Sequence, residues 1–525
     1  MQTNSKKRSL AVGIIILFAG ACVVPGHSGE RENKYNSHQI NEYRSSPSFY
    51  IDWWPMFHHY INHSGYTPSP GPTTNNVLWT YTIDYILPDV YSSPAVVDGK
   101  IYFGSEDRKV HCLNASTGVE IWNYTTSSKI YSSAAVADGN IYIGSNDGQL
   151  YCLDESTGVK IWNYTVGNYI WSDPTVTAGK VYVGSDDHKV YCLNASTGDW
   201  IWDYTTGWGV WSSPAVVDGK VYVGSLDAKV YCLNASTGTE VWESYINGFV
   251  AYSSPAVVDG KVYVGTDSQK IFCLYASNGT QIWNFITGDF VRSSPAVAAG
   301  KVYVGSLDGK VYCLNAATGG LIWSYTTASW VYSSPAVAAG RVYIGSHDEN
   351  VYCLDASTGG LIWEYFAGSY IYSSPAVVDG KVYIGSEGGT VYCFGPPPGQ
   401  PPAPPTINGS ANGNTGTTYP YTFTSIDPDG NQVSYYIDWG DGHTSGWLGP
   451  YTSGQPVTIA HTWEKKGTYV IQAKAKDTYG AESGWGTFTV TMPLSFEPPH
   501  FRFIDWLFER FPNAFPVLRY LLGFI

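Results

Sequence analysis

The chain has 525 residues, more than one domain usually holds, so we expect at least two domains. It carries 29 Lys and Arg against 43 Asp and Glu, a net charge of −14 with no basic tract, which argues against a nucleic-acid partner. Aromatic residues make up 16% of the chain, and its 57 Gly and 30 Pro predict strands joined by many turns.

Residues 1–21 have the pattern of a signal peptide. Positive residues at 6–8 precede an apolar run at 10–18, and small residues follow at 19–21. Cys22 comes next, so cleavage leaves either a lipidated Cys22 or a free one. Both outcomes place the protein outside the cytoplasm, secreted or anchored on the outer face of the cell membrane.

After a lead-in at 22–74, the chain repeats with a period of 40 residues and one interval of 41. Tryptophans mark this period, and a Ser-Ser-Pro-Ala-Val segment recurs with them. Such a period predicts a solenoid array or a propeller. The marking residues are Trp122, Trp162, Trp202, Trp242, Trp283, Trp323 and Trp363.

One unit divides into four short strands, at 214–217, 220–224, 229–233 and around 241–242. Asp218-Gly219 is a strong hairpin turn between the first two strands. Both faces of the strands are apolar, which is typical of a sheet packed between two other sheets. Helical periodicity is missing, so the sequence predicts an all-β propeller of four-stranded blades.

The blade count follows from the ends of the repeat. Eight units have a third strand, but only seven are followed by a Trp strand, and residues 77–81 match the missing one. We therefore predict an eight-bladed β-propeller at 75–395, in which this N-terminal strand closes the last blade and leaves no open edge.

The segment from Cys112 to Trp122 resembles the tryptophan-docking motif of the pyrroloquinoline-quinone (PQQ) repeat family, in seven copies. The resemblance implies that each Trp packs on the motif of the next blade. It also implies a possible activity, that of the quinoprotein dehydrogenases, which hold PQQ and calcium on the propeller axis. The docking residues are Trp79, Trp122, Trp162, Trp202, Trp242, Trp283, Trp323 and Trp363.

Nearly identical repeats offer no asymmetric constellation for catalysis, and the chain has no adjacent cysteine pair. We therefore expect no enzyme activity, no catalytic residues, no metal site and neither PQQ nor calcium as a cofactor. His58 and His59 lack a nearby carboxylate cluster, which favours a structural pair over metal ligands. One Cys per blade favours buried free thiols over disulfides, which need Cα atoms within about 7 Å; a metal-binding thiol ring is the alternative.

The segment between each Trp strand and the next unit varies, and its last position is aromatic in seven copies. In a propeller these positions meet at one mouth of the ring. They either stack on a ligand, such as a glycan or a protein, or simply fill the channel. Asp in seven hairpin turns, from Asp107 to Asp348, predicts an acidic rim there. The candidate ligand-binding residues are Tyr91, Tyr131, Trp171, Trp211, Tyr252, Arg292, Tyr332 and Tyr372.

A proline-rich linker at 396–406 leads to residues 407–493, which resemble a PKD-type immunoglobulin-like β-sandwich through Trp439-Gly440-Asp441-Gly442 and the strand at 467–477. The resemblance implies a spacer or adhesion module. Asp427, Asp429 and Asp438 either contribute to a calcium site or form a turn. The apolar tail at 494–525 either lies at a membrane, binds a partner or packs back on its neighbour.

Together these features predict a non-enzymatic extracellular or cell-surface binding and scaffold protein, which we expect to be a monomer. Its expected partner is a glycan or an envelope or surface protein. Secretion without an anchor and a membrane tether through Cys22 or the tail both stay open. Two alternatives stay open, namely an envelope assembly factor of the propeller-lipoprotein type and a PQQ-dependent dehydrogenase-like protein.

Overall fold

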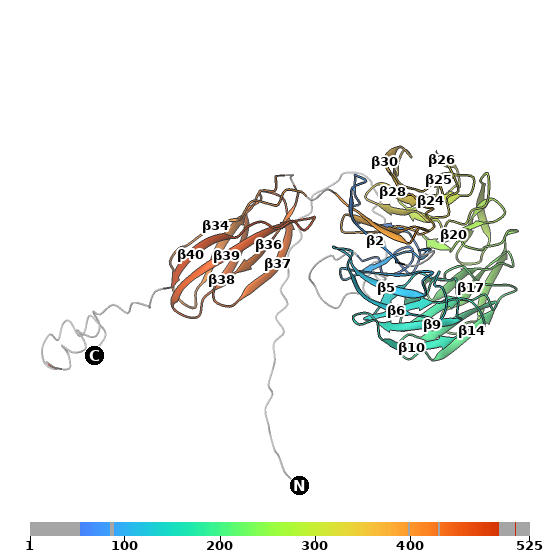
Figure 1. Cartoon of the computed structure of the whole chain (residues 1–525), viewed down its shortest axis with the longest axis horizontal. Coiled ribbons are helices and arrows are strands. Elements are labelled where there is room, and N and C mark those ends of the chain that lie inside the picture. The colour runs from blue at the N-terminus through green and yellow to red at the C-terminus, as the bar shows by residue number, and fades with distance from the viewer. Residues whose placement is uncertain (1–52, 85–88, 397–398, 429–430, 493–509, 511–525) are drawn as a thin grey trace, which may run out of the picture. The chain divides into compact units, whose positions relative to one another are not determined.

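A computed structural model describes residues 53–84, 89–396, 399–428, 431–492 and 510. The expected signal peptide, Cys22, Asp429 and almost all of the apolar tail lie outside the described residues. The repeats form the propeller and the following residues form a separate β-sandwich (Figure 1).

Eight four-stranded antiparallel sheets form the blades, and each runs from a three-residue inner strand to an outer strand. Short strand β1 (Tyr66–Thr67) adds to the seventh blade. The first four blades are β3 (Ala95–Val97), β4 (Lys100–Gly104), β5 (Lys109–Asn114), β6 (Glu120–Thr125); β7 (Ala135–Ala137), β8 (Asn140–Gly144), β9 (Gln149–Asp154), β10 (Lys160–Thr165); β11 (Thr175–Thr177), β12 (Lys180–Gly184), β13 (Lys189–Asn194), β14 (Trp200–Thr205); and β15 (Ala215–Val217), β16 (Lys220–Gly224), β17 (Lys229–Asn234), β18 (Glu240–Tyr245).

The other four blades follow the same order. They are β19 (Ala256–Val258), β20 (Lys261–Thr266), β21 (Lys270–Tyr275), β22 (Gln281–Ile286); β23 (Ala296–Ala298), β24 (Lys301–Ser306), β25 (Lys310–Asn315), β26 (Leu321–Thr326); β27 (Ala336–Ala338), β28 (Arg341–Gly345), β29 (Asn350–Asp355), β30 (Leu361–Phe366); and β31 (Ala376–Val378), β32 (Lys381–Gly385), β33 (Thr390–Phe394) with β2 (Val77–Thr82).

The last blade is completed by the N-terminal strand. β2 pairs antiparallel with β33, with Trp79 opposite Cys393 and Tyr81 opposite Val391. This pairing confirms the predicted eight blades and the predicted closing strand, and it covers the edge of β33.

The sequence dictates the blade locally. Asp218 and Gly219 have φ values of 49° and 69°, as a two-residue hairpin turn requires, and they join β15 to β16. The central strands of each blade are buried on both faces because neighbouring blades cover them; Tyr222, for example, is 2% exposed and Cys232 is 0% exposed. The blades thus pack as the two-sided apolar pattern predicts.

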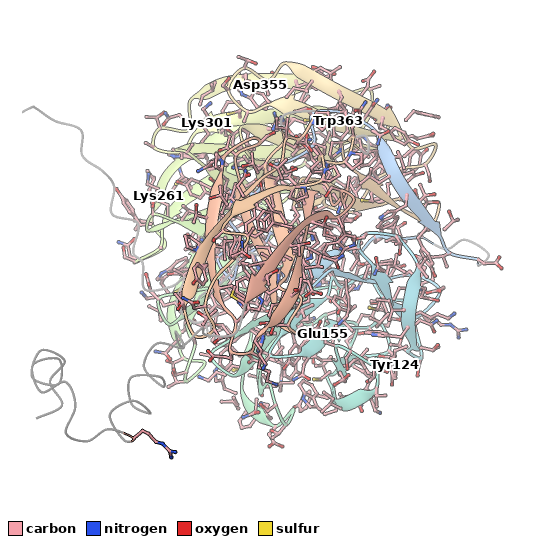
Figure 2. All side chains as sticks on the ribbon, turned by 90° about the vertical axis from the view of Figure 1, so that its left-hand side faces the viewer. Tyr124, Glu155, Lys261, Lys301, Asp355 and Trp363 are labelled. Carbon is pink, nitrogen blue, oxygen red and sulfur yellow. The ribbon has the colours of Figure 1, made fainter. Side chains whose placement is uncertain are left out.

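Each docking Trp lies against the next blade. Its indole Nε1 donates to a backbone carbonyl at 3.0–3.2 Å, as Trp79 does to Ala115 and Trp283 to Ala316. Trp363 instead reaches Pro72 of the lead-in, because the eighth blade lacks that turn. Figure 2 labels Trp363 together with two lysines, Lys261 and Lys301, that bridge blades through Ala316 and Ala356.

The described part of the lead-in lies on the propeller axis. Residues 54–70 hydrogen-bond to the inner strand, or to the turn after it, in seven blades, and the eighth contact joins His63 Nε2 to Thr175 Oγ1 at 3.4 Å. So short a segment reaches all eight blades only where the inner strands converge. The seven backbone contacts are Trp54 with Val96, Pro55 with Val136, Ile61 with Val216, Asn62 with Val257, Ser64 with Val297, Gly65 with Val337 and Pro70 with Gly380.

The inside of the ring is therefore filled by side chains that do not belong to the repeats. Trp54 is 1% exposed, and His58 and His63 are buried with it. Burial lowers the pKa of His58 to about 4 and that of His63 to about 3, so both imidazoles are neutral near pH 7. His58 and His63 therefore pack on the axis as neutral groups, and His63 also contacts Thr175.

The eight cysteines of the blades are free and fully buried, one on the third strand of each blade. Burial raises the pKa of their thiols to about 12, as for Cys192 and Cys232, so they carry no thiolate near neutral pH. Their role is to fill the space between sheets.

The sandwich consists of two antiparallel sheets around Tyr421, Tyr435, Trp439 and Trp463. One sheet is β34 (Thr406–Gly409), β35 (Thr418–Thr424) and β38 (Val457–Thr462); the other is β37 (Thr444–Tyr451), β36 (Val433–Asp438), β39 (Gly467–Asp477) and β40 (Gly486–Met492). This confirms the predicted immunoglobulin-like sandwich. Asp427 accepts from Asn431 N and Asp438 from Gly440 N, as turn residues do.

Among the described residues, no helix has the length and apolar character that crossing a membrane requires.

Candidate functional site

The variable positions lie in the loops that join each outer strand to the next inner strand. Within each loop a buried Val or Ile packs on a strand-end glycine; a Cβ on Gly104 would lie 2.1 Å from Ile130 Cγ2. The loop before β19 holds one extra residue, Ala251, which accounts for the interval of 41 residues. Anchoring by the buried residue brings the variable position of every loop to the axis.

The structure brings all eight predicted residues together in a closed ring, the aromatic ring. Each member contacts the next. Tyr131 and Trp171 are stacked at 4.3 Å with an interplanar angle of 9°. The centroid distances of the other aromatic pairs are 5.2 Å for Tyr91–Tyr131, 5.6 Å for Trp171–Trp211, 5.1 Å for Trp211–Tyr252, 5.0 Å for Tyr332–Tyr372 and 4.6 Å for Tyr372–Tyr91.

Arg292 closes the ring between two tyrosines. Its Cζ lies 5.1 Å from the Tyr252 ring centroid and 5.9 Å from that of Tyr332. Nε and Nη2 donate to the two carboxylate oxygens of Asp267, both at 3.0 Å. The propeller thus holds a cation in its ring with aromatic faces and one bidentate carboxylate. Tyr252 is 39% exposed and the other ring members are half-buried, so solvent reaches the ring.

A second ring, of hydrogen bonds, lies two residues further along the chain. The backbone N of Ser93 donates to Ser133 Oγ, and the pattern continues around the axis until Ser374 N donates to Ser93 Oγ. Its eight bonds span 2.5–3.0 Å. Asp173 replaces serine in the third blade, and burial raises the pKa of its carboxyl to about 6.

The predicted acidic rim needs a correction. Six of its seven aspartates fix their own turns: Asp187, for example, accepts from Lys189 N, Tyr191 Oη and Gly167 N. Asp267 is the exception, since Ser268 occupies that turn position in its blade and Asp267 stands one residue earlier. The residue type repeats, but its register does not.

The carboxylates that do contact the ring are residues that the sequence analysis missed. Glu387 accepts from Tyr91 Oη at 3.1 Å, Glu106 from Tyr131 Oη at 2.5 Å and Asp186 from Trp211 Nε1 at 2.7 Å. With Asp267 they occupy the turn position one before the recurrent aspartate. Register-aligned comparison of the turns would have revealed them.

Asp89 is a further acid of this group. Burial, followed by the neighbouring charges of Glu106 and Glu387, raises the pKa of Asp89 to about 6, and the charge of Lys129 opposes this shift. Lys129 itself pairs with Glu106, at 2.7 Å between Nζ and Oε2. His347 takes the equivalent turn position in the seventh blade, stacks on Tyr370, and has its pKa lowered to about 4 by burial. It adds no charge near pH 7.

Pyrroloquinoline quinone is a flat tricarboxylate, and the charges at the aromatic ring do not fit it. Glu106, Asp186 and Glu387 would repel it, Arg292 is already paired with Asp267, and the lead-in occupies the axis. We derive no reaction step through this cofactor, and its absence stays a prediction. Within the described ranges, no group of three or more His, Cys, Asp or Glu residues is placed to hold a metal ion.

Comparison with known proteins gives two family matches. Residues 70–401 match the family described as outer membrane protein assembly factor BamB, in the overlapping segments 70–169, 127–207, 167–287 and 273–401. Residues 406–491 match the PKD domain. No curated protein matches the chain.

Among solved structures, BamB from Moraxella catarrhalis is 20% identical, with a TM-score of 0.54 over 62% of this chain and 98% of that chain. Quinohemoprotein alcohol dehydrogenase from Comamonas testosteroni is 17% identical, with a TM-score of 0.57 over 66% and 82%. At such identities the likeness shows the propeller fold alone. The PKD domain of an M14-like peptidase from Thermoplasmatales archaeon SCGC AB-540-F20 is 58% identical, with a TM-score of 0.18 over 18% and 98%.

Proposed function

Because the chain belongs to the BamB family over residues 70–401 and carries a PKD domain, we propose that it is a non-enzymatic binding and scaffold protein of the cell envelope or surface. The propeller contacts its ligand, a glycan or a protein, through the aromatic ring. The observation that carries this proposal is the closed ring of eight partly exposed side chains at one mouth.

The chemistry of the ring supports binding rather than catalysis. Its members offer π faces, an indole N–H and phenolic O–H groups, which recognise ligands without bond breaking. Neighbouring carboxylates hold the tips of Tyr91, Tyr131 and Trp211 by hydrogen bonds, which fixes this part of the ring before a ligand arrives. A preformed surface of this kind loses little conformational entropy on binding.

Binding of a panel of neutral oligosaccharides and peptides to the full chain tests the proposal. We expect Trp171→Ala and Trp211→Ala to weaken binding of any ligand found by at least about tenfold, because both remove stacking area at the centre of the site. Trp200→Ala is the matched control, since Trp200 is 54% exposed on an outer strand away from the ring. Failure of the parent protein to bind any member of the panel, or equal loss in the control, would contradict the proposal.

A second candidate function is assembly of other envelope proteins, which the description of the matched family favours. It predicts a protein ligand at the ring. Photo-cross-linking from position 252 in envelope extracts, followed by mass spectrometry, should recover the same membrane protein repeatedly. We expect Trp211→Ala to reduce the yield of this cross-linked protein. An unchanged yield would show that the aromatic ring does not bind it.

A further inference from the structure

The aromatic ring has two chemically different halves. One half, the acidic arc, consists of Tyr91, Tyr131, Trp171 and Trp211 with the carboxylates of Asp89, Glu106, Asp186 and Glu387. The other half contains Arg292 and its partner Asp267. In the remaining blades the turn position that supplies most of these acids holds Asn146, Leu226, Leu307 or His347. The charge is therefore concentrated in one part of the mouth.

The acidic arc has more negative charge than its own cations balance. Of its four carboxylates, Glu106 pairs with Lys129. Asp186 receives hydrogen bonds from Trp211 Nε1 and Asn168 Nδ2, and Glu387 from Tyr91 Oη, all of which are neutral donors. Neutral donors hold a carboxylate in place but leave its charge available to a ligand.

Arg292 shows that tyrosine rings and a turn carboxylate of this mouth together bind a guanidinium group. Its guanidinium lies between the rings of Tyr252 and Tyr332. It forms a bidentate pair with Asp267, which lies in the turn between β20 and β21 of the preceding blade. The acidic arc contains the same components, aromatic faces and turn carboxylates, on the other blades. Trp, Tyr and carboxylate together are the groups that attract guanidinium and ammonium ions.

We infer that the acidic arc binds the basic side chains of an arginine- or lysine-containing segment of a partner protein. This inference rests on the proposed function, because it names the ligand class of the same ring. The overall charge of −14 also favours approach of a basic segment. Because the lead-in occupies the axis beneath the ring, the segment enters and leaves by one mouth, as a loop or a chain end does.

The test compares two peptides that differ only in charge. A decapeptide of alternating Gly and Arg is titrated into the full chain, and the same peptide with citrulline for arginine is the control, since citrulline keeps the shape and loses the charge. We expect the arginine peptide to bind at least about tenfold more tightly at low salt and to weaken as ionic strength rises.

Two substitutions locate the site. Glu106→Gln and Asp186→Asn keep acceptors for Tyr131 and Trp211 but remove charge, and each should weaken the arginine peptide about fivefold or more while thermal melting stays unchanged. Glu243→Gln is the control, because Glu243 lies on outer strand β18, where it pairs with Lys229 of β17. Equal binding of the two peptides, or unchanged affinity in both arc variants, would overturn the inference.

The same experiment separates this inference from the function it rests on. If the citrulline peptide or a neutral oligosaccharide binds as well as the arginine peptide and is lost in Trp211→Ala, the ring is a binding site but its ligand is not basic. If none of them binds the parent protein, the proposed function fails as well.

Discussion

The two ends of the propeller axis are built from different kinds of sequence. At one end, eight equivalent loops each contribute one side chain to the aromatic ring, so the repeats themselves form the mouth. Towards the other end, the described part of the non-repeating lead-in contacts the inner strand, or the turn after it, in all eight blades and fills the axis. Repetition can line an axis but cannot fill it, because one position in eight copies lies on a circle around the centre. A chain without the symmetry is needed there.

Replacing a tryptophan by alanine in the lead-in and in the aromatic ring should give the largest difference in stability. Trp54→Ala removes a side chain that is 1% exposed and should lower the free energy of unfolding by about 3–5 kcal/mol. Trp171→Ala removes a half-buried side chain and should cost no more than about 2 kcal/mol. Urea denaturation measures both free energies of unfolding. Equal losses would mean that Trp54 of the lead-in stabilises the propeller no more than a side chain of the mouth loops does.

A glycine pair sharpens the same contrast at the backbone. Gly65 has φ +62°, and a Cβ there would lie 2.7 Å from Ala296 Cβ. Gly65→Ala should therefore cost about 3 kcal/mol, from left-handed strain plus overpacking. Gly300 has φ +71° with nothing within 4 Å, so Gly300→Ala isolates the strain, about 1 kcal/mol. Equal thermal shifts of the two variants would show that the lead-in can move aside.

The third prediction concerns Asp173, which interrupts the ring of serines. Its pKa of about 6 exceeds the unfolded value, so the folded protein binds the proton more tightly, and stability falls as pH rises from about 4 to 6. Asp173→Ser should raise the free energy of unfolding by about 1–3 kcal/mol at pH 8, with little gain below pH 4. Asp199→Ser, on an exposed turn, controls for charge; a gain independent of pH would contradict the assignment.

The propeller is largely predictable from sequence because its packing repeats. The closing strand is visible at Trp79 and Tyr81, which copy the spacing of Trp122 and Tyr124, and the ring is visible because its members share one place in each loop. The confirmed family and fold rest on that periodicity. Whether the ring binds a ligand stays a prediction.

What the sequence did not reveal has physical reasons. The lead-in binds the inner strands through backbone carbonyls, such as those of Pro55 and Ile61, and backbone contacts leave no pattern of residue types. The acids of the mouth were not predicted because the turns were compared by their shared aspartate and not by position. Asp267 stands one position earlier in its turn than Asp227 does. The acids of the candidate site differ between blades, so no repeating residue type marks them in the sequence.

The lead-in and β2 leave the ribosome before any of the blades that they contact, and β33 is the last partner to be made. Native closure therefore waits for Phe394, and the newly made chain carries an unpaired aromatic strand until then. Partly synthesised molecules expose an edge that pairs readily with other chains. For this propeller, safe biogenesis depends on keeping its first strand unpaired until the last one arrives.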